Sequence, residues 1–296
     1  MNDARRALVT GGTGFIGGHL VRRLLADGHE VHVIVQPGIE QIPAGATSHV
    51  YDGTMERMLS IVSETSPDVT FHLASVFLAN HTAGQVDSLV TSNVLLGTQL
   101  LEAMTECGCR RLVNTGTGWQ HFGGPEYDPV NLYAATKQAF EDIARYYVAR
   151  EISTTTLALY DTYGPCDPRP KVLPLLIKAA LSGEQLDLSP GEQLLHLVYV
   201  DDIVDAFMVA AAGLEAKSPP TVHRYSITAQ PPLSLRELAA AVERVTGRSI
   251  DARWGARAYR DREVLTPWVG EHLPGWCPKI GIDEGIRRVI EADRAS

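Results

Sequence analysis

The residues best suited to chemistry are a tyrosine and a lysine four positions apart, Tyr133 and Lys137, inside a segment of helical periodicity. This spacing places the phenol and the ammonium group on one helix face, about one turn apart. A free phenol has a pKa near ~10, and a cation within ~4–6 Å lowers it. The pair could therefore act as an acid/base, although most such pairs are only neighbours on a helix surface.

Hydroxyl groups that could assist this acid/base follow a predicted strand. The strand-like run 111–114 leads directly into Thr115 and Thr117, which alternate with glycines. Open α/β sheets bind ligands at the carboxyl ends of their strands. One of these hydroxyls could therefore hydrogen-bond a carbonyl oxygen held beside Tyr133, and the alternative interpretation is a polar turn without a ligand.

A glycine-rich turn joins the first predicted strand to the first predicted helix. Its glycines allow a tight turn, let backbone N–H groups approach a pyrophosphate, and direct a helix N-terminus at the negative charge. Because a strand precedes it and a helix follows, the turn predicts a dinucleotide site. The residues expected to bind the cofactor there are Gly11, Thr13, Gly14, Phe15, Ile16 and Gly17.

The end of the second predicted strand distinguishes the two nicotinamide cofactors. An acidic side chain there would bind the adenosine ribose of NAD, but this chain has Val35, Gln36 and Pro37. NADP(H) is therefore favoured, since no carboxylate repels a 2′-phosphate; NAD(H) stays possible, because no arginine follows the strand either. Asp52, followed by Gly53, either accepts a hydrogen bond from the adenine amino group or only forms a turn.

The elements that must position these groups alternate between strands and helices. Apolar runs of strand length are typical of a parallel sheet that is buried on both faces. We therefore expect an α/β fold with a Rossmann-like, doubly wound parallel sheet. The predicted strands are 7–9, 31–35, 69–73, 112–113, 156–159, 195–200 and 222–227. The predicted helices are 16–26, 55–64, 86–107, 132–150, 172–181, 202–212 and 283–292.

The regular alternation stops after Tyr160, where a proline-rich loop begins. A capping box at Ser234 and Glu237 opens a further helix that Gly247 ends, and the segment 254–279 is expected to be irregular. The simplest organisation has a dinucleotide-binding domain of residues 1–165 and 193–228. A smaller, discontinuous C-terminal substrate domain would contain residues 166–192 and 229–296.

Composition narrows the class of protein. The 296 residues are 45% hydrophobic and 21% charged, typical of a globular protein. A formal net charge of −9 argues against nucleic-acid binding, and no apolar run approaches the ~20 residues of a membrane span. The first residues lack the pattern of a secretion signal, and the four cysteines show no metal-binding spacing. We expect free thiols, no metal site and a cytoplasmic protein.

Together the motifs resemble the extended short-chain dehydrogenases/reductases that act on nucleotide-activated sugars. The resemblance covers nearly the whole chain. Its motifs are Gly11-x-x-Gly14-x-x-Gly17, Asp52, His72-Leu73-Ala74, Asn93 with Gly97-Thr98, Tyr133-x-x-x-Lys137, Tyr163-Gly164-Pro165 and Val200-Asp201-Asp202. The resemblance implies that Thr117 orients the substrate carbonyl, with Thr115 as the alternative. It also implies that Tyr133 is the acid/base and that Lys137 binds the nicotinamide ribose and lowers the pKa of Tyr133. The cofactor site then also includes Gln36, Gly53, Leu73, Ala74, Ser75, Asn93 and Tyr160.

Departures from the family pattern indicate the reaction. The 4,6-dehydratases of this type carry Asp-Glu after the catalytic threonine, where this chain has Gly118 and Trp119. The 4-epimerases retain NAD and usually have an acidic residue where this chain has Val35. The chain looks most like the 4-ketoreductases of deoxysugar pathways, which implies NADPH-dependent reduction of a dTDP- or CDP-linked 4-keto-6-deoxyhexose. The alternatives are a 4-epimerase of NDP-hexoses and a non-catalytic NADP-binding regulator.

The substrate's diphosphate needs positive charge. Many relatives have an arginine where this chain has Leu195, which leaves Arg169, Lys171 and Arg260 as candidates, although each could be a solvated surface charge. Trp119 is expected in the sugar pocket, whereas His121 is more readily explained as an ordinary loop histidine. The resemblance also implies a homodimer formed by the helices 86–107 and 132–150.

Overall fold

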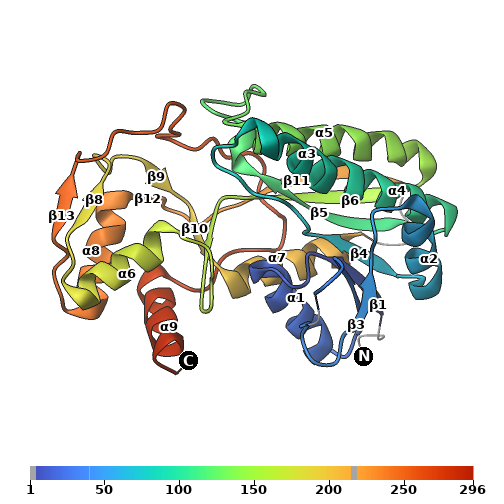
Figure 1. Ribbon diagram of the computed structural model, residues 1–296, viewed down its shortest axis with the longest axis horizontal. Coiled ribbons are helices and arrows are strands. Elements are labelled where there is room, and N and C mark those ends of the chain that lie inside the picture. The colour runs from blue at the N-terminus through green and yellow to red at the C-terminus, as the bar shows by residue number, and fades with distance from the viewer. Residues whose placement is uncertain (1–4, 40, 215–218, 296) are drawn as a thin grey trace.

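The centre of the protein is a parallel sheet, shown in Figure 1. The computed structural model describes residues 5–39, 41–214 and 219–295. Within them, seven strands form this sheet in the order β11-β6-β5-β4-β1-β2-β3, with every pair parallel. The strands are β1 (Arg6–Thr10), β2 (Glu30–Val35), β3 (Thr47–Val50), β4 (Val69–His72), β5 (Arg111–Thr117), β6 (Ser153–Leu159) and β11 (Val222–Ile227).

The strand order confirms the expected Rossmann-like, doubly wound sheet. From β1 the chain builds outward to β2 and β3, and then returns to place β4 on the other side of β1. Thr10, the last residue of β1, pairs with Ile34 on one side and His72 on the other. A sheet of this kind opens a crevice at the carboxyl ends of the strands where the order reverses. Ligands are therefore expected beside the ends of β1 and β4.

Helices cover both faces of the sheet. Helices α1 (Phe15–Ala26) and α7 (Val200–Gly213) pack against one face, with Leu20 and Phe207 fully buried. The opposite face is covered by α2, α4 and α5, whose core includes Ile61, Leu100 and Phe140. The bounds of these helices are Met55–Thr65, Leu96–Glu106 and Leu132–Tyr146. The apolar faces of these helices, which the periodicity of the sequence predicted, thus pack against the sheet.

The predicted helix 86–107 is one helical segment with an irregular turn. It consists of α3 (Val86–Val90), a π-helical turn at Thr91–Leu95, and α4. The predicted helix 132–150 similarly ends as α5 at Tyr146 and continues as a 3₁₀ turn, Tyr147–Arg150. Turns of the π type often occur at functional sites. The π-helical turn contains Asn93, and apolar periodicity did not predict it.

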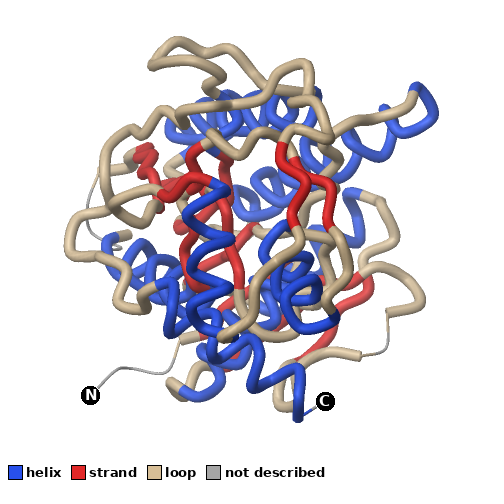
Figure 2. The backbone as a smooth tube through the Cα atoms, turned by 90° about the vertical axis from the view of Figure 1, so that its left-hand side faces the viewer, coloured by secondary structure: helices blue, strands red, loops and turns tan. Residues whose placement is uncertain are grey.

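A smaller part of the protein packs around α6 (Val172–Ser182), α8 (Leu235–Thr246) and α9 (Ile282–Ala295). Figure 1 shows it beside the sheet, and Figure 2 turns it toward the viewer. Its strands β8 (Leu186–Leu188) and β13 (Ala252–Trp254) pair in parallel. The capping box of α8 is present as predicted, with Gly247 at the C-terminal end in a left-handed conformation. The predicted domain boundaries stay a prediction.

The predicted strand 195–200 is wrong as a single element. The chain forms two short strands, β9 (Leu194–Leu195) and β10 (Leu197–Tyr199), which pair with β12 (Leu233–Ser234) and β7 (Asp161–Tyr163) respectively. His196 separates them, because its buried ring hydrogen-bonds the carbonyl of Ala229 at 2.8 Å. The described helices include none with the length and apolar character to cross a membrane.

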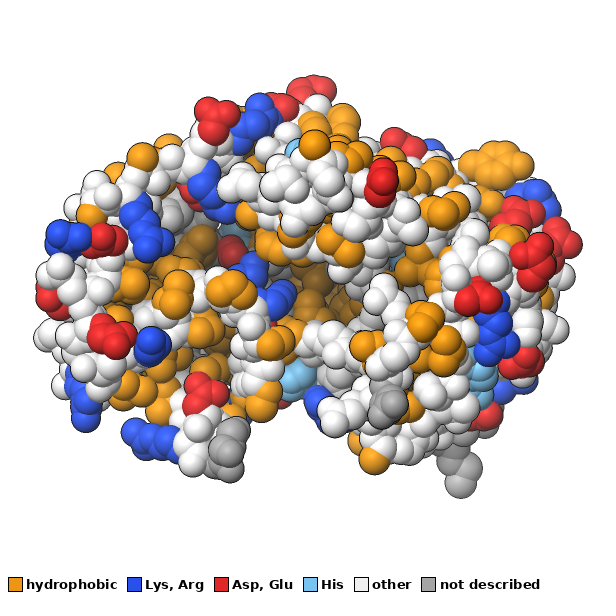
Figure 3. Space-filling view, viewed as in Figure 1, with side chains coloured by type: hydrophobic (Ala, Val, Ile, Leu, Met, Phe, Trp, Pro, Cys, Tyr) orange, Lys and Arg blue, Asp and Glu red, His pale blue; other side chains and the backbone are white. Residues whose placement is uncertain are grey.

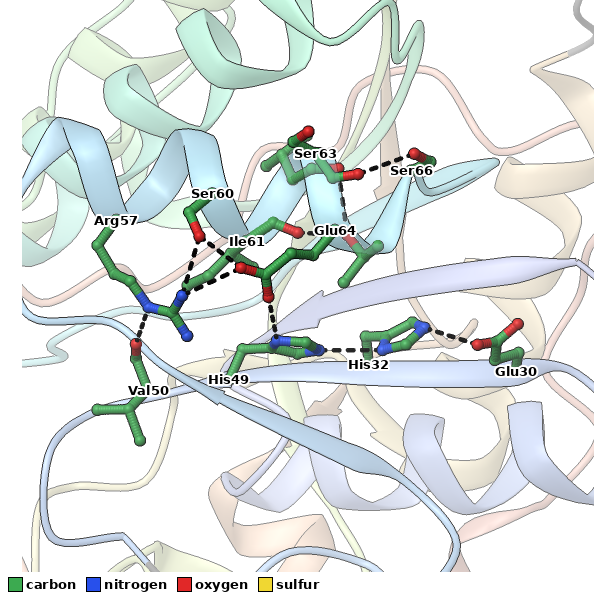
Figure 4. Close-up of polar contacts among 12 residues, drawn as sticks. Glu30, His32, His49, Val50, Arg57, Ser60, Ile61, Ser63, Glu64 and Ser66 are labelled. Carbon is green, nitrogen blue, oxygen red and sulfur yellow. Dashed lines mark hydrogen bonds and ion pairs between the residues drawn. The ribbon is translucent and has the colours of Figure 1, made fainter.

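The outer edge of the sheet carries two hydrogen-bonded histidines, shown in Figure 4. His32 Nδ1 on β2 lies 3.0 Å from His49 Nε2 on β3. The other ring nitrogen of His32, Nε2, lies 3.1 Å from Glu30 Oε1. On the far side of the pair, His49 Nδ1 lies 3.7 Å from Glu64 Oε2 of α2. Burial lowers the pKa of His49, and the neighbouring His32 lowers it further. The ring of His49 therefore resists protonation in the folded protein.

Candidate active site

A cavity of about 370 Å³ opens where the strand order reverses. Figure 3 shows the molecule hollowed between the sheet and the smaller part, with charged side chains at the hollow. The cavity is lined by residues of the glycine-rich turn, the ends of β4, β5 and β6, the start of α5 and the loop before α6. They are Gly11, Gly14, Phe15, Ile16, Gly17, Leu73, Ser75, Phe77, Thr115, Gly116, Thr117, Trp119, Tyr133, Leu159, Tyr160, Asp161, Thr162, Pro168, Arg169 and Lys171.

The glycine-rich turn at one end of the cavity has no room for side chains. A Cβ on Gly11 would stand 2.6 Å from the backbone nitrogen of Ala74, and its φ of +72° favours glycine. A Cβ on Gly17 would collide with the carbonyl oxygen of Gly11. Gly14 caps α1 without a side-chain hydrogen bond, so first-turn N–H groups remain for a ligand. These features fit the pyrophosphate of a dinucleotide.

Tyr133 projects into the cavity from the first turn of α5 and is only 9% exposed. Burial raises the pKa of its phenol to about 12. The hydroxyls of Ser75 and Thr117 and the charge of Arg169 act in the opposite direction. Tyr133 therefore holds its proton at neutral pH and can donate it to a group in the cavity.

Lys137 lies one helical turn behind Tyr133 and is 1% exposed. Its ammonium group has no hydrogen-bond partner among the residues that the structure describes. Burial lowers the pKa of Lys137 to about 8, while the nearby carboxylate of Glu141 raises it. An unpartnered buried ammonium fits the hydroxyls of a cofactor ribose. The predicted effect of Lys137 on the pKa of Tyr133 stays a prediction.

The two candidate threonines both line the cavity, but only Thr117 acts on the phenol of Tyr133. Thr117 ends β5, and its hydroxyl accepts a hydrogen bond from the backbone N–H of Trp119 at 3.2 Å. The hydroxyl of Thr115 is buried without a partner in the described chain. The structure therefore brings together Thr117 and Tyr133, the pair preferred from the sequence.

Asn93 lies behind the cavity wall and shapes it. Its amide oxygen accepts hydrogen bonds from the Ser75 hydroxyl at 3.0 Å and the Val76 N–H at 2.8 Å. Its amide nitrogen donates to the Val76 carbonyl and to the Thr136 hydroxyl, both at 3.0 Å. The fully satisfied side chain thus fixes the segment after β4, so that Ser75 stands beside Tyr133.

The remaining predicted cofactor residues divide into two groups. Leu73, Phe15, Ile16 and Tyr160 line the cavity. Those outside its lining are Thr13, Gln36, Asp52, Gly53 and Ala74. The Asp52 carboxylate accepts hydrogen bonds from the backbone and hydroxyl of Thr54 at 2.9 and 2.7 Å, which is a turn contact.

Two of the predicted basic residues reach the cavity, and their surroundings differ. Arg169 is held by Asp167 at 2.7 Å, and its guanidinium stacks over Phe15 at 4.8 Å. Lys171 has no ion pair within the described residues, and its ammonium stands 4.9 Å above the ring of Phe77. Lys171 thus lacks a direct ion pair, and the nearby carboxyl group of Asp161 raises its pKa against the effect of burial. Arg260 pairs with Glu263 outside the cavity lining.

The two predicted pocket aromatics also differ. Trp119 lines the cavity and packs against Phe77, with ring centroids 5.6 Å apart. His121 does not line it. The ring of His121 bonds the carbonyl of Glu126 at 3.0 Å and packs on Trp268, so it behaves as a loop histidine.

Two cavity residues were missed in the sequence. Phe77 packs edge-on against Tyr133, with ring centroids 5.0 Å apart. Asp161 follows β6, and burial raises the pKa of its carboxyl group while Lys171 opposes the rise. The available signal for Asp161 was a carboxylate two residues after the end of β6, at the start of β7.

A third missed residue, Arg22, lies in a neighbouring hollow of about 320 Å³ that begins at Thr13 and also includes His19 and Gln41. Arg22 forms no ion pair with any residue described in the structure. Its Nη2 atom lies 3.5 Å from where a Cβ on Gly18 would stand. The guanidinium therefore extends over a glycine toward the turn. Across the described ranges, no group of three or more His, Cys, Asp or Glu side chains could hold a metal ion.

Comparison with known proteins places these features in a family. Residues 7–227 match the model of the NAD dependent epimerase/dehydratase family. A CDP-abequose synthase of Yersinia pseudotuberculosis is 28% identical over 264 residues, covering 88% of this chain and 91% of that protein. A UDP-glucose 4-epimerase of Mycolicibacterium smegmatis is 28% identical over 315 residues, covering 97% of each chain. The solved structure of the Thermus thermophilus UDP-glucose 4-epimerase with NAD is 27% identical, with a TM-score of 0.81 over 98% of this chain and 99% of that one.

Proposed function

The chain belongs to the NAD dependent epimerase/dehydratase family, and on this premise we propose that it is an NADPH-dependent reductase of nucleotide-activated 4-keto-6-deoxyhexoses. Relatives named CDP-abequose synthase and UDP-glucose 4-epimerase both support a nucleotide-sugar substrate. The reaction proposed is reduction of the ketone at C4 to an alcohol.

One arrangement carries the proposal: a protonated, buried phenol beside a threonine hydroxyl, with an unpartnered ammonium one helical turn behind. Tyr133 and Thr117 face the same cavity, and the ammonium group of Lys137 lies beneath them without a hydrogen-bond partner in the described part of the chain. A carbonyl oxygen between the two hydroxyls would be oriented by Thr117 and protonated by Tyr133. The acid that a ketone reduction needs is therefore in place.

In the proposed reduction, different residues of the chain bind the cofactor, orient the substrate carbonyl and donate the proton. A bound NADPH would supply the hydride to C4, held by the glycine-rich turn and by Lys137. As negative charge develops on the C4 oxygen, Tyr133 donates its proton to that oxygen, while Thr117 keeps the oxygen in reach. Phe77 and Trp119 pack together in the cavity wall and present an apolar surface to the reacting carbonyl.

The preference for NADPH is supported at two positions. Gln36, the first residue after β2, is exposed and uncharged, so this position sets no carboxylate against a 2′-phosphate. Arg22 provides a cation in the hollow beside the glycine-rich turn that forms no ion pair with the described residues. For the substrate's diphosphate we propose Lys171 as the main cation, because Asp167 already compensates Arg169.

The test is NADPH consumption by the purified protein with dTDP- and CDP-linked 4-keto-6-deoxyglucose and their 3-deoxy forms, with NADH in parallel. Oxidation of NADPH by one ketosugar, with a C4 alcohol by NMR, would support the proposal. Interconversion of a saturated NDP-hexose without added cofactor would instead establish the alternative, a 4-epimerase that retains NAD. A protein that binds NADPH and acts on none of these sugars would be the non-catalytic regulator.

We also propose that the protein is a homodimer. Large apolar side chains are exposed on the segment from α3 to α5, including Val90, Leu95 and Tyr146 at 44%, 45% and 61%. Large apolar side chains that remain exposed are a feature of surfaces that bind another protein subunit. Light scattering would give the dimer mass, and Tyr146→Glu should shift that mass toward the monomer.

A further inference from the structure

A buried polar cluster behind the cavity holds the backbone of Thr117 on both sides. The Gln120 side-chain oxygen accepts a hydrogen bond from the Thr117 N–H at 3.0 Å. The Arg224 guanidinium donates to the Thr117 carbonyl at 3.2 Å and to the Gln120 oxygen at 3.3 Å. The two peptide groups flanking the Thr117 side chain are thereby held, one by Gln120 of the adjoining 3₁₀ turn and the other by Arg224 of β11.

Glu141 connects this cluster to the helix of the acid/base. Its carboxylate accepts a hydrogen bond from the Gln120 amide nitrogen at 2.9 Å and lies 3.3 Å from Arg224 Nε. Tyr133, Lys137 and Glu141 follow one another at four-residue intervals on α5, so they share one face of the helix. The cluster therefore ties the end of β5 to α5 and to the edge strand β11.

The local sequence makes room for this contact. A Cβ on Gly116 would stand 2.8 Å from a Glu141 oxygen and 3.4 Å from the Gln120 oxygen. The side chain of Glu141 is 11% exposed and that of Arg224 22%. Buried charges of this kind are costly unless they are paired and hydrogen-bonded. Two hydrogen bonds of this cluster end on the backbone of Thr117, and the others link Gln120 to Arg224, Glu141 and Gln138.

We propose that Glu141 is a positioning residue of the reductase: through Gln120 and Arg224 it fixes the Thr117 hydroxyl against Tyr133, and its charge balances the buried Lys137. This inference rests on the proposed function. The hydroxyl of Thr117 and the phenol of Tyr133 come from separate elements, and the Glu141 cluster joins those elements by buried polar contacts.

The charges around Lys137 define the second role of Glu141. His72 of β4 faces Lys137, and burial lowers its pKa to about 3, so its ring is neutral. Tyr133 on the same helix is also neutral near pH 7. Glu141 is the carboxylate that stabilises the Lys137 ammonium, and it shares its charge with Arg224 on β11. Loss of this charge would lower the pKa of Lys137 further.

The experiment compares Glu141→Gln with Asp142→Asn, a matched loss of one charge on the next residue of α5, which is exposed. Glu141→Gln keeps an oxygen for Gln120 but removes the charge. We expect kcat at pH 8 to fall about tenfold or more and the alkaline limit of kcat to move to lower pH by about one unit. Asp142→Asn should change kcat and its pH limit far less, because the Asp142 carboxylate bonds the Gln138 amide at 3.0 Å and contacts neither Gln120 nor Arg224.

A second variant separates geometry from charge. Gln120→Leu removes the bond to the Thr117 N–H, which should lower kcat about 10- to 100-fold with the KM for NADPH and the pH limit unchanged. Wild-type kcat and pH dependence in a folded Glu141→Gln protein would overturn the inference. If that protein does not fold, wild-type kcat in Gln120→Leu would overturn it equally.

Binding separates this inference from the proposed function. The pH dependence of NADP⁺ affinity, measured by calorimetry, reports the protonation of Lys137 without turnover. If the wild type reduces no ketosugar but Glu141→Gln still moves this binding limit to lower pH, only the proposed function fails. An unmoved limit overturns the role of the Glu141 charge.

Discussion

Replacing Lys137 by methionine should stabilise the protein while abolishing its activity. The ammonium of Lys137 is buried without a hydrogen-bond partner in the described structure. Burial lowers its pKa to about 8 from the ordinary value of 10.5. One pKa unit corresponds to ~1.4 kcal/mol, so the charged lysine costs about 3 kcal/mol of folding free energy at neutral pH. Methionine has a similar length and carries no charge.

The sign of the pH dependence follows from linkage. Below pH 8 the lysine is charged in both states and the folded state bears the full cost. As the pH rises from 8 toward 10.5, the folded protein releases this proton first and the cost disappears. The stability difference between Lys137→Met and the wild type should therefore be largest near pH 7 and shrink by pH 10.

The assay is thermal and urea unfolding at pH 7 and pH 10. For a protein of this size, about 3 kcal/mol corresponds to a rise in melting temperature of roughly 5–10 °C. Lys178→Met is the matched control, because Lys178 is an exposed helical lysine, and its effect should be within about 0.5 kcal/mol. A Lys137→Met protein less stable than the wild type at pH 7, or an advantage equal at both pH values, would refute the reasoning.

Three further predictions follow from single residues. Tyr133→Phe should abolish turnover and leave NADPH binding within about threefold, because the phenol oxygen acts on the substrate; fluorescence titration and kcat measure the two effects. Arg22→Ala should lower the selectivity for NADPH over NADH about tenfold or more, since hydrogen bonds to charged groups contribute ~1.5–3 kcal/mol; the ratio of the two kcat/KM values measures it. For the histidine pair, the pKa of His49 is lowered in the folded state, so unfolded chains bind its proton more readily and stability falls as the pH drops below about 6.5. His49→Gln should flatten this fall in urea unfolding between pH 7 and pH 5.

Each of these predictions has a contrary outcome. Retained turnover in Tyr133→Phe would remove the phenol from the mechanism. An unchanged cofactor ratio in Arg22→Ala would place the 2′-phosphate elsewhere, and Arg23→Ala, which removes a cation already paired with Asp27 and Asp205, serves as its control. A slope between pH 7 and pH 5 that is as steep in His49→Gln as in the wild type would assign the acid sensitivity to other groups.

Local pattern in the sequence determined much of the fold and part of the site. The glycine-rich turn could be predicted from its own residues, the glycines at 11, 14 and 17 and the apolar runs beside them. A strand, a tight turn and a helix N-terminus are local structures, so their sequence signals do not depend on the rest of the fold. The four-residue spacing of Tyr133 and Lys137 likewise places both side chains on one face of the helix, because of the helical repeat alone. The family pattern then singled out Thr117, which the structure brings to Tyr133.

Other features were decided only by tertiary structure. The apolar pattern of residues 195–200 could not show that they form two strands. β9 and β10 each pair with a strand that is distant in the sequence, and only the tertiary structure brings those partners together. In the sequence, Arg22 and Asp161 cannot be distinguished from ordinary polar residues. The packing of distant elements leaves Arg22 without an ion pair among the described residues and buries Asp161.

The contacts of Glu141 show most clearly what could not be predicted from the sequence alone. It meets Gln120, 21 residues away, and Arg224, 83 residues away, across three elements. Burial, charge compensation and the pKa of a side chain depend on which distant groups surround it. The sequence therefore determined which groups can perform the chemistry, and the packing of the sheet against its helices decided which of them meet and in what state of protonation.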